Sequence, residues 1–150
     1  MEKIDLQEKT KPIRGKGEIY WFENENIGLK RTLFHRFYIQ LAPFDSGLAY
    51  ESQPLDTEIV FEWLKLDLTD PTNLNGLELT SQPEDDTEVS IYVGSAHNPC
   101  DIKGMKFHKI EDNRYKVDCS LFVDFEHEGV AQNEEFHFST ELTLDRNIKE

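Results

Sequence analysis

The 150-residue sequence has only two cysteines, Cys100 and Cys119, and it has no long apolar run. Two cysteines without a signal peptide are typical of reduced thiols rather than of a disulfide framework. No segment approaches the roughly 20 apolar residues that a membrane-spanning helix needs. Residues 1–16 also carry charged side chains where a secretion signal would have an apolar core. We therefore expect a soluble, cytoplasmic protein.

The signature motifs of catalysis and nucleotide binding are missing as well. The chain has no glycine-rich phosphate loop, no G-x-S-x-G elbow, no H-E-x-x-H and no C-x-x-C. A base-stacking platform around Trp21 or Trp63 would need a basic groove, whereas the net charge is −14. The sequence therefore favours a protein that binds over one that catalyses. It implies no cofactor, no nucleic acid and no membrane partner.

Lysine and arginine are scarce in two long parts of the chain. Residues 41–102 contain Lys65 alone against 13 acidic residues, and residues 117–145 contain eight acidic residues and no lysine or arginine. The intervening residues 103–116 contain five basic side chains. Two acidic blocks around a basic hairpin predict one strongly negative surface, which would attract basic proteins. A surface that serves only solubility is the alternative.

The clearest structural signal is alternation in two segments near the C-terminus. Between Tyr115 and Phe125, and again between Phe136 and Leu144, apolar residues recur at almost every second position. The intervening residues are mostly polar or acidic. Because side chains of a strand point alternately to opposite faces, both segments are predicted to be amphipathic strands. They fit an antiparallel sheet with one face in water.

Shorter alternating segments with turn signals between them recur along the rest of the chain. They predict an all-β fold with little or no helix, either an antiparallel β-sandwich or a partly open barrel of about eight strands. Residues 17–150 are predicted to form a single β domain. Residues 1–16 are predicted to be a flexible or loosely attached N-terminal arm.

Residues 57–68 fit two kinds of element. Ile59, Phe61 and Trp63 alternate in one phase, and the leucines that follow alternate in the other phase. This phase change predicts a strand with a bulge near Trp63. A helix capped by Asp56 also fits the pattern. The β-branched and aromatic residues favour the strand.

Two residues of special chemistry fall on apolar strand faces. Cys119 alternates in phase with Val117, so we expect a small core residue rather than a reactive thiol. His35 shares the phase of Phe37, and we expect a core or edge histidine whose ring finds a hydrogen-bond partner.

Residues 94–104 are predicted to form the most polar long loop, and loops of this kind often carry binding sites. The candidate ligand-binding residues are His97, Asn98, Cys100 and Asp101. A cysteine and a histidine can form a catalytic pair when the two side chains meet. Here no third group is evident to orient the histidine, so no catalytic residue is assigned.

Acidic residues also gather near one end of the C-terminal strand pair, around residues 127–137. Their spacing matches neither a calcium loop nor a zinc motif, and we assign no metal ligands. We expect these carboxylates to pair with lysines and arginines of a partner. The predicted partner-binding residues are Asp118, Asp124, Glu126, Glu128, Glu134, Glu135 and Glu141.

The leading functional hypothesis is a non-enzymatic acidic domain that docks a basic protein, such as a toxin or an enzyme. An inhibitor, for example the immunity protein of a bacterial toxin, fits the size, the charge and the missing motifs. The alternative is a β-sandwich that binds a small ligand or metal, or acts as a hydrolase, at residues 94–104 or 127–137. A third hypothesis is self-association through exposed sheet edges, so we expect a monomer or a weak homodimer.

Overall fold

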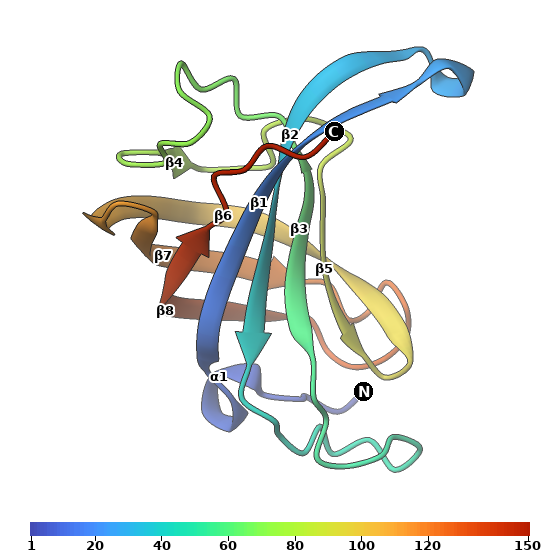
Figure 1. Cartoon of the computed structure of the whole chain (residues 1–150). Helices are drawn as coiled ribbons and strands as arrows, with labels where there is room; N and C mark the ends of the chain where they lie inside the picture. The colour runs from blue at the N-terminus through green and yellow to red at the C-terminus, as the bar shows by residue number, and fades with distance from the viewer.

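The computed structural model describes all 150 residues and consists almost entirely of β-strands (Figure 1). The elements are α1 (Leu6–Lys9), β1 (Pro12–Asn24), the 3₁₀ turn η1 (Glu25–Ile27), β2 (Leu29–Leu41), β3 (Glu58–Leu64), β4 (Glu78–Leu79), β5 (Glu88–Val93), β6 (Ala96–Glu111), β7 (Arg114–Val123) and β8 (Glu134–Leu144). Neither short helical element has the length and apolar content needed to cross a membrane. The predicted all-β fold with little helix is confirmed.

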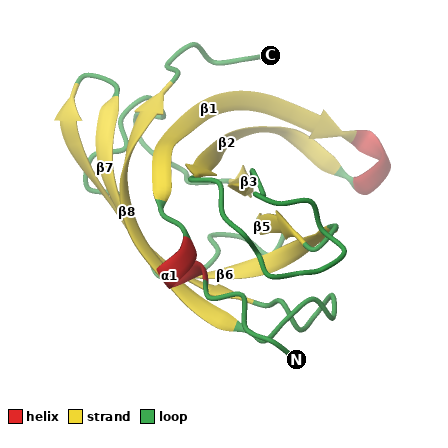
Figure 2. Cartoon of the chain, turned by 90° about the horizontal axis from the view of Figure 1, so that it is seen from below, coloured by secondary structure: helices red, strands yellow, loops and turns green.

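The strands form one sheet that closes on itself. Their order is β4-β6-β5-β3-β2-β1-β8-β7, and β6 also pairs with β7, so seven strands close into a barrel with β4 attached outside it. Strands β1, β2, β3 and β5 form one wall, and β6, β7 and β8 cross behind it (Figures 1 and 2). A partly open barrel was one of the two expected architectures. The barrel is closed instead, because β1 and β8 join in a short parallel ladder.

Apolar side chains from both walls fill the barrel. The core cluster contains 29 buried residues, and it includes every apolar residue in the inward phase of the two alternating segments that begin at Tyr115 and Phe136. The predicted alternation of these two strands is therefore confirmed. Because the interior is a packed core, functional side chains have to lie on the outer face or at the rims.

The N-terminal residues are bound more firmly than the sequence suggested. Ile4 and Leu6 are 1% and 0% exposed and belong to the core cluster, and β1 already begins at Pro12. The prediction of a flexible or loosely attached arm over residues 1–16 is therefore wrong. Two apolar side chains in an otherwise charged segment were enough to anchor it, because each is buried completely.

Hydrogen bonds to β8 complete this anchor. The buried Glu134 carboxylate accepts the backbone N–H groups of Asp5 at 3.0 Å and Leu6 at 2.6 Å. The Gln7 side-chain amide donates to the His137 carbonyl at 2.8 Å and accepts the His137 N–H at 2.9 Å. Gln7 thereby pairs with the backbone of β8 as a neighbouring strand would.

The predicted loop over residues 94–104 is wrong. Gly94 and Ser95 have φ values of 67° and 59° and form a two-residue hairpin turn, and β6 begins directly after it at Ala96. Paired positive φ angles are the geometry of the tight turns that join antiparallel strands. The sequence concealed the strand because Asn98, a polar residue, occupies an inward position.

The predicted strand with a bulge is present in β3, Glu58–Leu64, whereas residues 65–68 lie beyond its end. Trp63 has a φ of 58°, and the β2–β3 register shifts between the pairs made by His35 and Phe37. The bulge turns the Trp63 ring against Tyr20 and Phe34, with centroid distances of 5.9 and 5.4 Å. These aromatic contacts support the β1–β2 hairpin where it extends beyond the barrel (Figure 1).

Barrel closure depends on two glycines of β1. The parallel β1–β8 ladder has only three residue pairs, and two of them use Gly15 and Gly17. A Cβ atom on Gly17 would lie 3.1 Å from side-chain carbons of both Leu144 and Phe37. A side chain here would therefore push the two strands apart.

We predict that Gly17→Val lowers the free energy of unfolding by about 1–3 kcal/mol, as overpacking of a filled core does. Urea denaturation followed by tryptophan fluorescence measures the change. The matched control is Gly104→Val in β6, where an added Cβ would meet no atom within 4 Å. Equal losses in the two variants would contradict the role of Gly17 in closure.

His35 is the one histidine in the interior. It is 2% exposed, its Nε2–H donates to the Pro71 carbonyl at 2.8 Å, and its Nδ1 has no partner. Burial lowers the pKa of His35, and the hydrogen bond to Pro71 offsets only part of that effect. The ring is therefore neutral in the folded protein and charges readily only after unfolding.

This histidine predicts a pH-dependent loss of stability. Below about pH 6.5 the unfolded chain binds a proton at His35 that the folded chain does not. The free energy of unfolding therefore decreases as the pH is lowered, by up to about 1.4 kcal/mol per pH unit. His35→Gln should reduce this slope between about pH 7 and pH 5.5. His108→Gln, at an exposed position of β6, should leave it unchanged. Equal slopes for wild type and His35→Gln in denaturation series would refute the assignment.

Candidate functional site: an acidic groove on the barrel wall

The predicted partner-binding carboxylates do not form one surface. Asp118, Glu135 and Glu141 lie on the outer face of β7 and β8. Asp124, Glu126 and Glu128 lie on the loop between these strands, and Glu134 is 6% exposed. Glu134 holds the N-terminal segment, so its assignment to a partner-binding surface is corrected.

Two of the three carboxylates on the β7–β8 face already have cationic neighbours, and the third lies beside a histidine. Glu141 lies 3.3 Å from Arg114, and Asp118 lies 3.9 Å from Lys116. Glu135 lies 3.4 Å from the His137 ring. Because β6 also places lysines beside this face, its surface is of mixed charge rather than acidic.

On the β7–β8 loop, two of the three carboxylates are used to shape the loop. Asp124 accepts the His127 N–H at 3.1 Å. Glu126 accepts the Asn133 N–H at 3.0 Å, while its own N–H donates to the Asn133 side chain at 2.9 Å. Glu128 is exposed and makes no ion pair or hydrogen bond within the protein. It is the carboxylate of this loop that a partner could bind.

The four predicted ligand-binding residues face opposite sides of β6. Asn98 and Cys100 point inward and are 0% and 2% exposed, whereas His97 and Asp101 point outward. The Asn98 amide donates to the carbonyls of Ile91, Val93 and Ala96 at 2.9 to 3.1 Å, so it stabilises the β5–β6 hairpin. A single site made of all four residues is therefore not formed.

Neither cysteine has the surroundings of a nucleophile. Burial raises the pKa of the Cys100 thiol well above its usual range, and burial raises the pKa of Cys119 to about 12. A thiol without its proton is the reactive form, and both thiols keep theirs at neutral pH. The interpretation of Cys119 as a core residue is confirmed by its 4% exposure.

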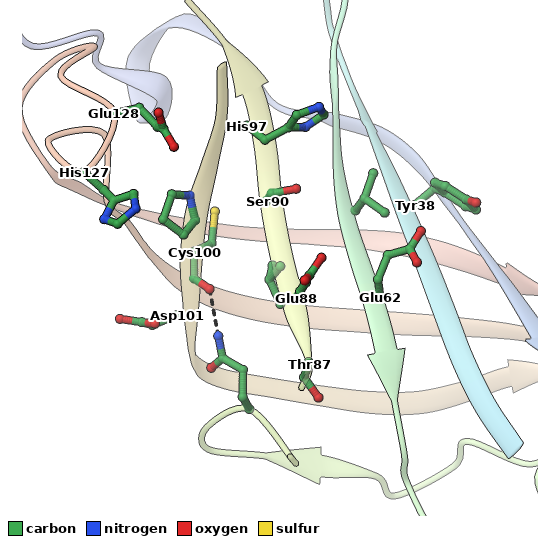
Figure 3. A pocket seen from close by; sticks show the side chains of 14 residues that line it. Tyr38, Glu62, Thr87, Glu88, Ser90, His97, Cys100, Asp101, His127 and Glu128 are labelled. Atoms are coloured by element: carbon green, nitrogen blue, oxygen red, sulfur yellow. Dashed lines mark hydrogen bonds between the residues drawn. The ribbon is translucent and has the colours of Figure 1, made fainter. Parts of the chain in front are cut away.

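His97 and Asp101 open onto a groove of about 790 Å³ on the outer face of the barrel (Figure 3). Figure 3 shows Glu88 on β5 in the middle of the groove, with Glu62 of β3 on one side and Glu128 of the β7–β8 loop on the other. The groove is lined by 14 residues, and none of them is a lysine or an arginine. It brings together parts of both segments that the sequence had singled out separately.

Most of the negative charge in this groove is uncompensated. Glu62 pairs with Arg36, whose Nε lies 3.0 Å from the carboxylate. Glu88, Asp101 and Glu128 are exposed and have no cation within 4.0 Å. Carboxylates that share a concave surface reinforce one another's field, so the groove is a favourable place for a positive group.

Hydrogen bonds between one side chain and the backbone of β6 fix the position of one wall of the groove. The Gln82 side chain donates to the Cys100 carbonyl at 2.8 Å and accepts the Ile102 N–H at 3.0 Å, which holds the chain between β4 and β5 against β6. At the other end, the His97 ring packs on Tyr92 with centroids 4.8 Å apart. The acidic side chains therefore project from strands whose positions are fixed by these contacts.

The groove offers charge and hydrogen-bond acceptors but little reactive chemistry. No three histidine, cysteine, aspartate or glutamate side chains lie close enough together to hold a metal ion. The two thiols are buried, and the groove contains no activated nucleophile. Its exposed carboxylates, together with His97 and His127, are suited to binding a cation of a larger molecule.

Sequence reasoning missed Glu62 and Glu88 as site residues. A signal was present, because both lie in the acidic block of residues 41–102 and both fall in the outward phase of a strand. Strand order was the missing information. Only the β6-β5-β3 neighbourhood places these two carboxylates beside Asp101.

No protein-family model, curated protein or solved structure matches this chain, so its function has to be argued from the groove itself.

Proposed function

We propose that this protein is a non-enzymatic binding protein whose acidic groove docks a basic partner protein. One observation carries the proposal: Glu88, Asp101 and Glu128 line a single groove that has no lysine or arginine in its walls. Lysine and arginine side chains of a partner would find unpaired carboxylates there. An inhibitor of a basic toxin or enzyme, as an immunity protein is, fits this chemistry.

The overall charge of the protein supports the same function. A net charge of −14 attracts a basic protein from a distance, and an acidic concave surface directs it to one place. Complementary charge of this kind mainly raises the association rate and orients the encounter. Tight binding would need additional contacts around the groove, such as those that Tyr38 and Val60 in its lining can supply.

The outer face of β7 and β8 is a weaker candidate for the same role. Two of its carboxylates, Asp118 and Glu141, already contact cations of the protein itself, so a partner would have to replace existing pairs. The exchange of one exposed ion pair for another gains little free energy. The predicted docking site therefore moves from the β7–β8 face to the groove over β3, β5 and β6.

The small-ligand or metal alternative has less support. It depended on His97 acting together with Cys100, or on His127 acting together with His137. Both residues of the first pair line the groove, but the Cys100 thiol is buried and burial raises its pKa, so it is not a reactive partner for His97. In the second pair, His127 lines the groove whereas His137 lies on the β7–β8 face, hydrogen-bonded to Ser120 at 2.8 Å.

A comparison of two charge reversals tests the proposal. The groove variant is Glu88→Lys, Asp101→Lys and Glu128→Lys combined. The control variant is Asp118→Lys, Glu135→Lys and Glu141→Lys combined, which changes the net charge equally on the β7–β8 face. The probe is a fluorescent oligo-arginine peptide, and its binding is measured by anisotropy at low and at physiological salt.

We expect the groove variant to weaken peptide binding by about tenfold or more, which corresponds to about 1.4 kcal/mol. The control variant should weaken binding by less than about threefold, because only the general attraction changes. Equal losses in the two variants would mean that the charge acts through the whole surface, and the groove would lose its proposed role. Proteins that wild type and the control variant capture from a cell lysate, but that the groove variant does not capture, would be candidate partners.

A further inference from the structure

The edge of β1 is covered by the C-terminal residues of the chain. Strand β8 pairs with β1 only as far as Gly17, and residues 145–150 then run along β1 (Figure 1). The Lys149 N–H donates to the Ile19 carbonyl and the Trp21 N–H donates to the Lys149 carbonyl, both at 2.9 Å. Lys149 therefore pairs with β1 as one residue of a parallel strand.

This C-terminal tail, residues 145–150, is held only by contacts at the surface, one of which joins the Glu150 carboxylate to Arg31 at 2.5 Å. All six residues are exposed, and even Ile148 is 39% exposed. Three backbone hydrogen bonds join the tail to β1, the third from the Asp145 N–H to the Gly17 carbonyl at 2.8 Å. The N-terminal segment, by contrast, buries two apolar side chains in the core. The tail is thus the covering element that can leave without opening the core.

The contacts of Lys149 show which kind of side chain the edge of β1 binds. Its Nζ lies 3.5 Å from the Glu18 carboxylate and 2.9 Å from Asp145. Glu18 is fixed from the other side by Arg36 at 2.9 Å, and its side chain is only 15% exposed. Burial would raise the pKa of Glu18, but the hydrogen bond from Arg36 and the charge of Lys149 outweigh burial and lower it. The edge therefore combines backbone groups with a fixed, ionised carboxylate.

The edge is also longer than the tail that covers it. Past Trp21, β1 continues to Asn24 with β2 on one side and no strand on the other. An incoming segment could pair with the residues that the tail covers and continue along this uncovered part. Exposed strand edges of this kind accept extended peptides, with backbone hydrogen bonds for affinity and side-chain sites for specificity.

We propose that the β1 edge is a strand-addition site for an extended basic segment of a partner protein, and that the C-terminal tail occupies it until the partner binds. The incoming segment lies parallel to β1, with a lysine or arginine at the position of Lys149 and its charge against Glu18. The tail thus occupies the site in place of the partner segment, and its release uncovers the site. This proposal does not depend on the groove.

The test uses the full chain with the tail loosened by one substitution. Lys149→Glu places like charges beside Glu18 and Asp145. Arg146→Glu is the matched control, because it makes the same charge change in the tail at a residue without an ion pair or hydrogen bond. The probe is a synthetic peptide with the sequence of residues 144–150, and the readout is the backbone amide signal of Trp21 in NMR spectra.

In Lys149→Glu we expect the Trp21 amide to exchange at least about tenfold faster with solvent than in wild type or Arg146→Glu, because its acceptor has left. Added peptide should restore protection and shift this signal. The same peptide with glutamate in place of its lysine should not bind. Wild type and Arg146→Glu should need at least about tenfold more peptide for the same shift, since their own tails compete.

Three results would overturn the proposal. Equal protection of the Trp21 amide in all the proteins would show that Lys149 does not hold the tail. Equal binding of the lysine and glutamate peptides would remove the preference for a basic segment. Dimerisation of Lys149→Glu in light scattering, without peptide binding, would assign the edge to a second copy of the chain. The groove charge reversal should leave the peptide response unchanged, so the two proposals can fail separately.

Discussion

The three-residue parallel ladder between β1 and β8 is the constraint on which the rest of the structure depends. It closes the barrel only because Gly15 and Gly17 let the two strands approach across a filled core. A ladder this short leaves most of both strand edges unpaired, and unpaired edges invite aggregation. The protein covers the β8 edge with the Gln7 amide and the β1 edge with its C-terminal tail. One of these covers is anchored in the core, and the other is held at the surface.

The closure of the barrel also determines which charged side chains lie on the same surface. With β6 paired to both β5 and β7, the outward residues of β3, β5 and β6 lie side by side, and the β7–β8 loop reaches the same place. Acidic residues from distant parts of the sequence thus meet in one groove. On the other wall, lysines and arginines of β6 and β7 lie among the carboxylates. Charge that looks like two acidic blocks in the sequence becomes one acidic groove and one mixed face.

Sequence reasoning succeeded where local pattern and burial agreed, and it failed where tertiary contacts decided. The strand from Tyr115 and the bulge at Trp63 follow from alternation and from a change of its phase, which are properties of a single strand. The segment 94–104 seemed to be a loop because Asn98 is polar, yet its amide is satisfied by three carbonyls of the hairpin that it stabilises. Glu134 seemed to be a surface acid, and only the fold shows that two backbone N–H groups bury its carboxylate. The groove itself required the strand order, which no local pattern contains.

The placement of the cations is the feature in which the proposed binding surface differs from a merely solubilising one. Solubility requires net charge but no particular placement of lysine and arginine. In this protein, Arg36, Arg114 and Lys149 each contact two carboxylates, and all three lie outside the groove. The unpaired carboxylates that share a concave surface are therefore the ones open to cations from another molecule. At the β1 edge the chain supplies such a cation itself through Lys149, which shows the kind of group that its acidic positions accept.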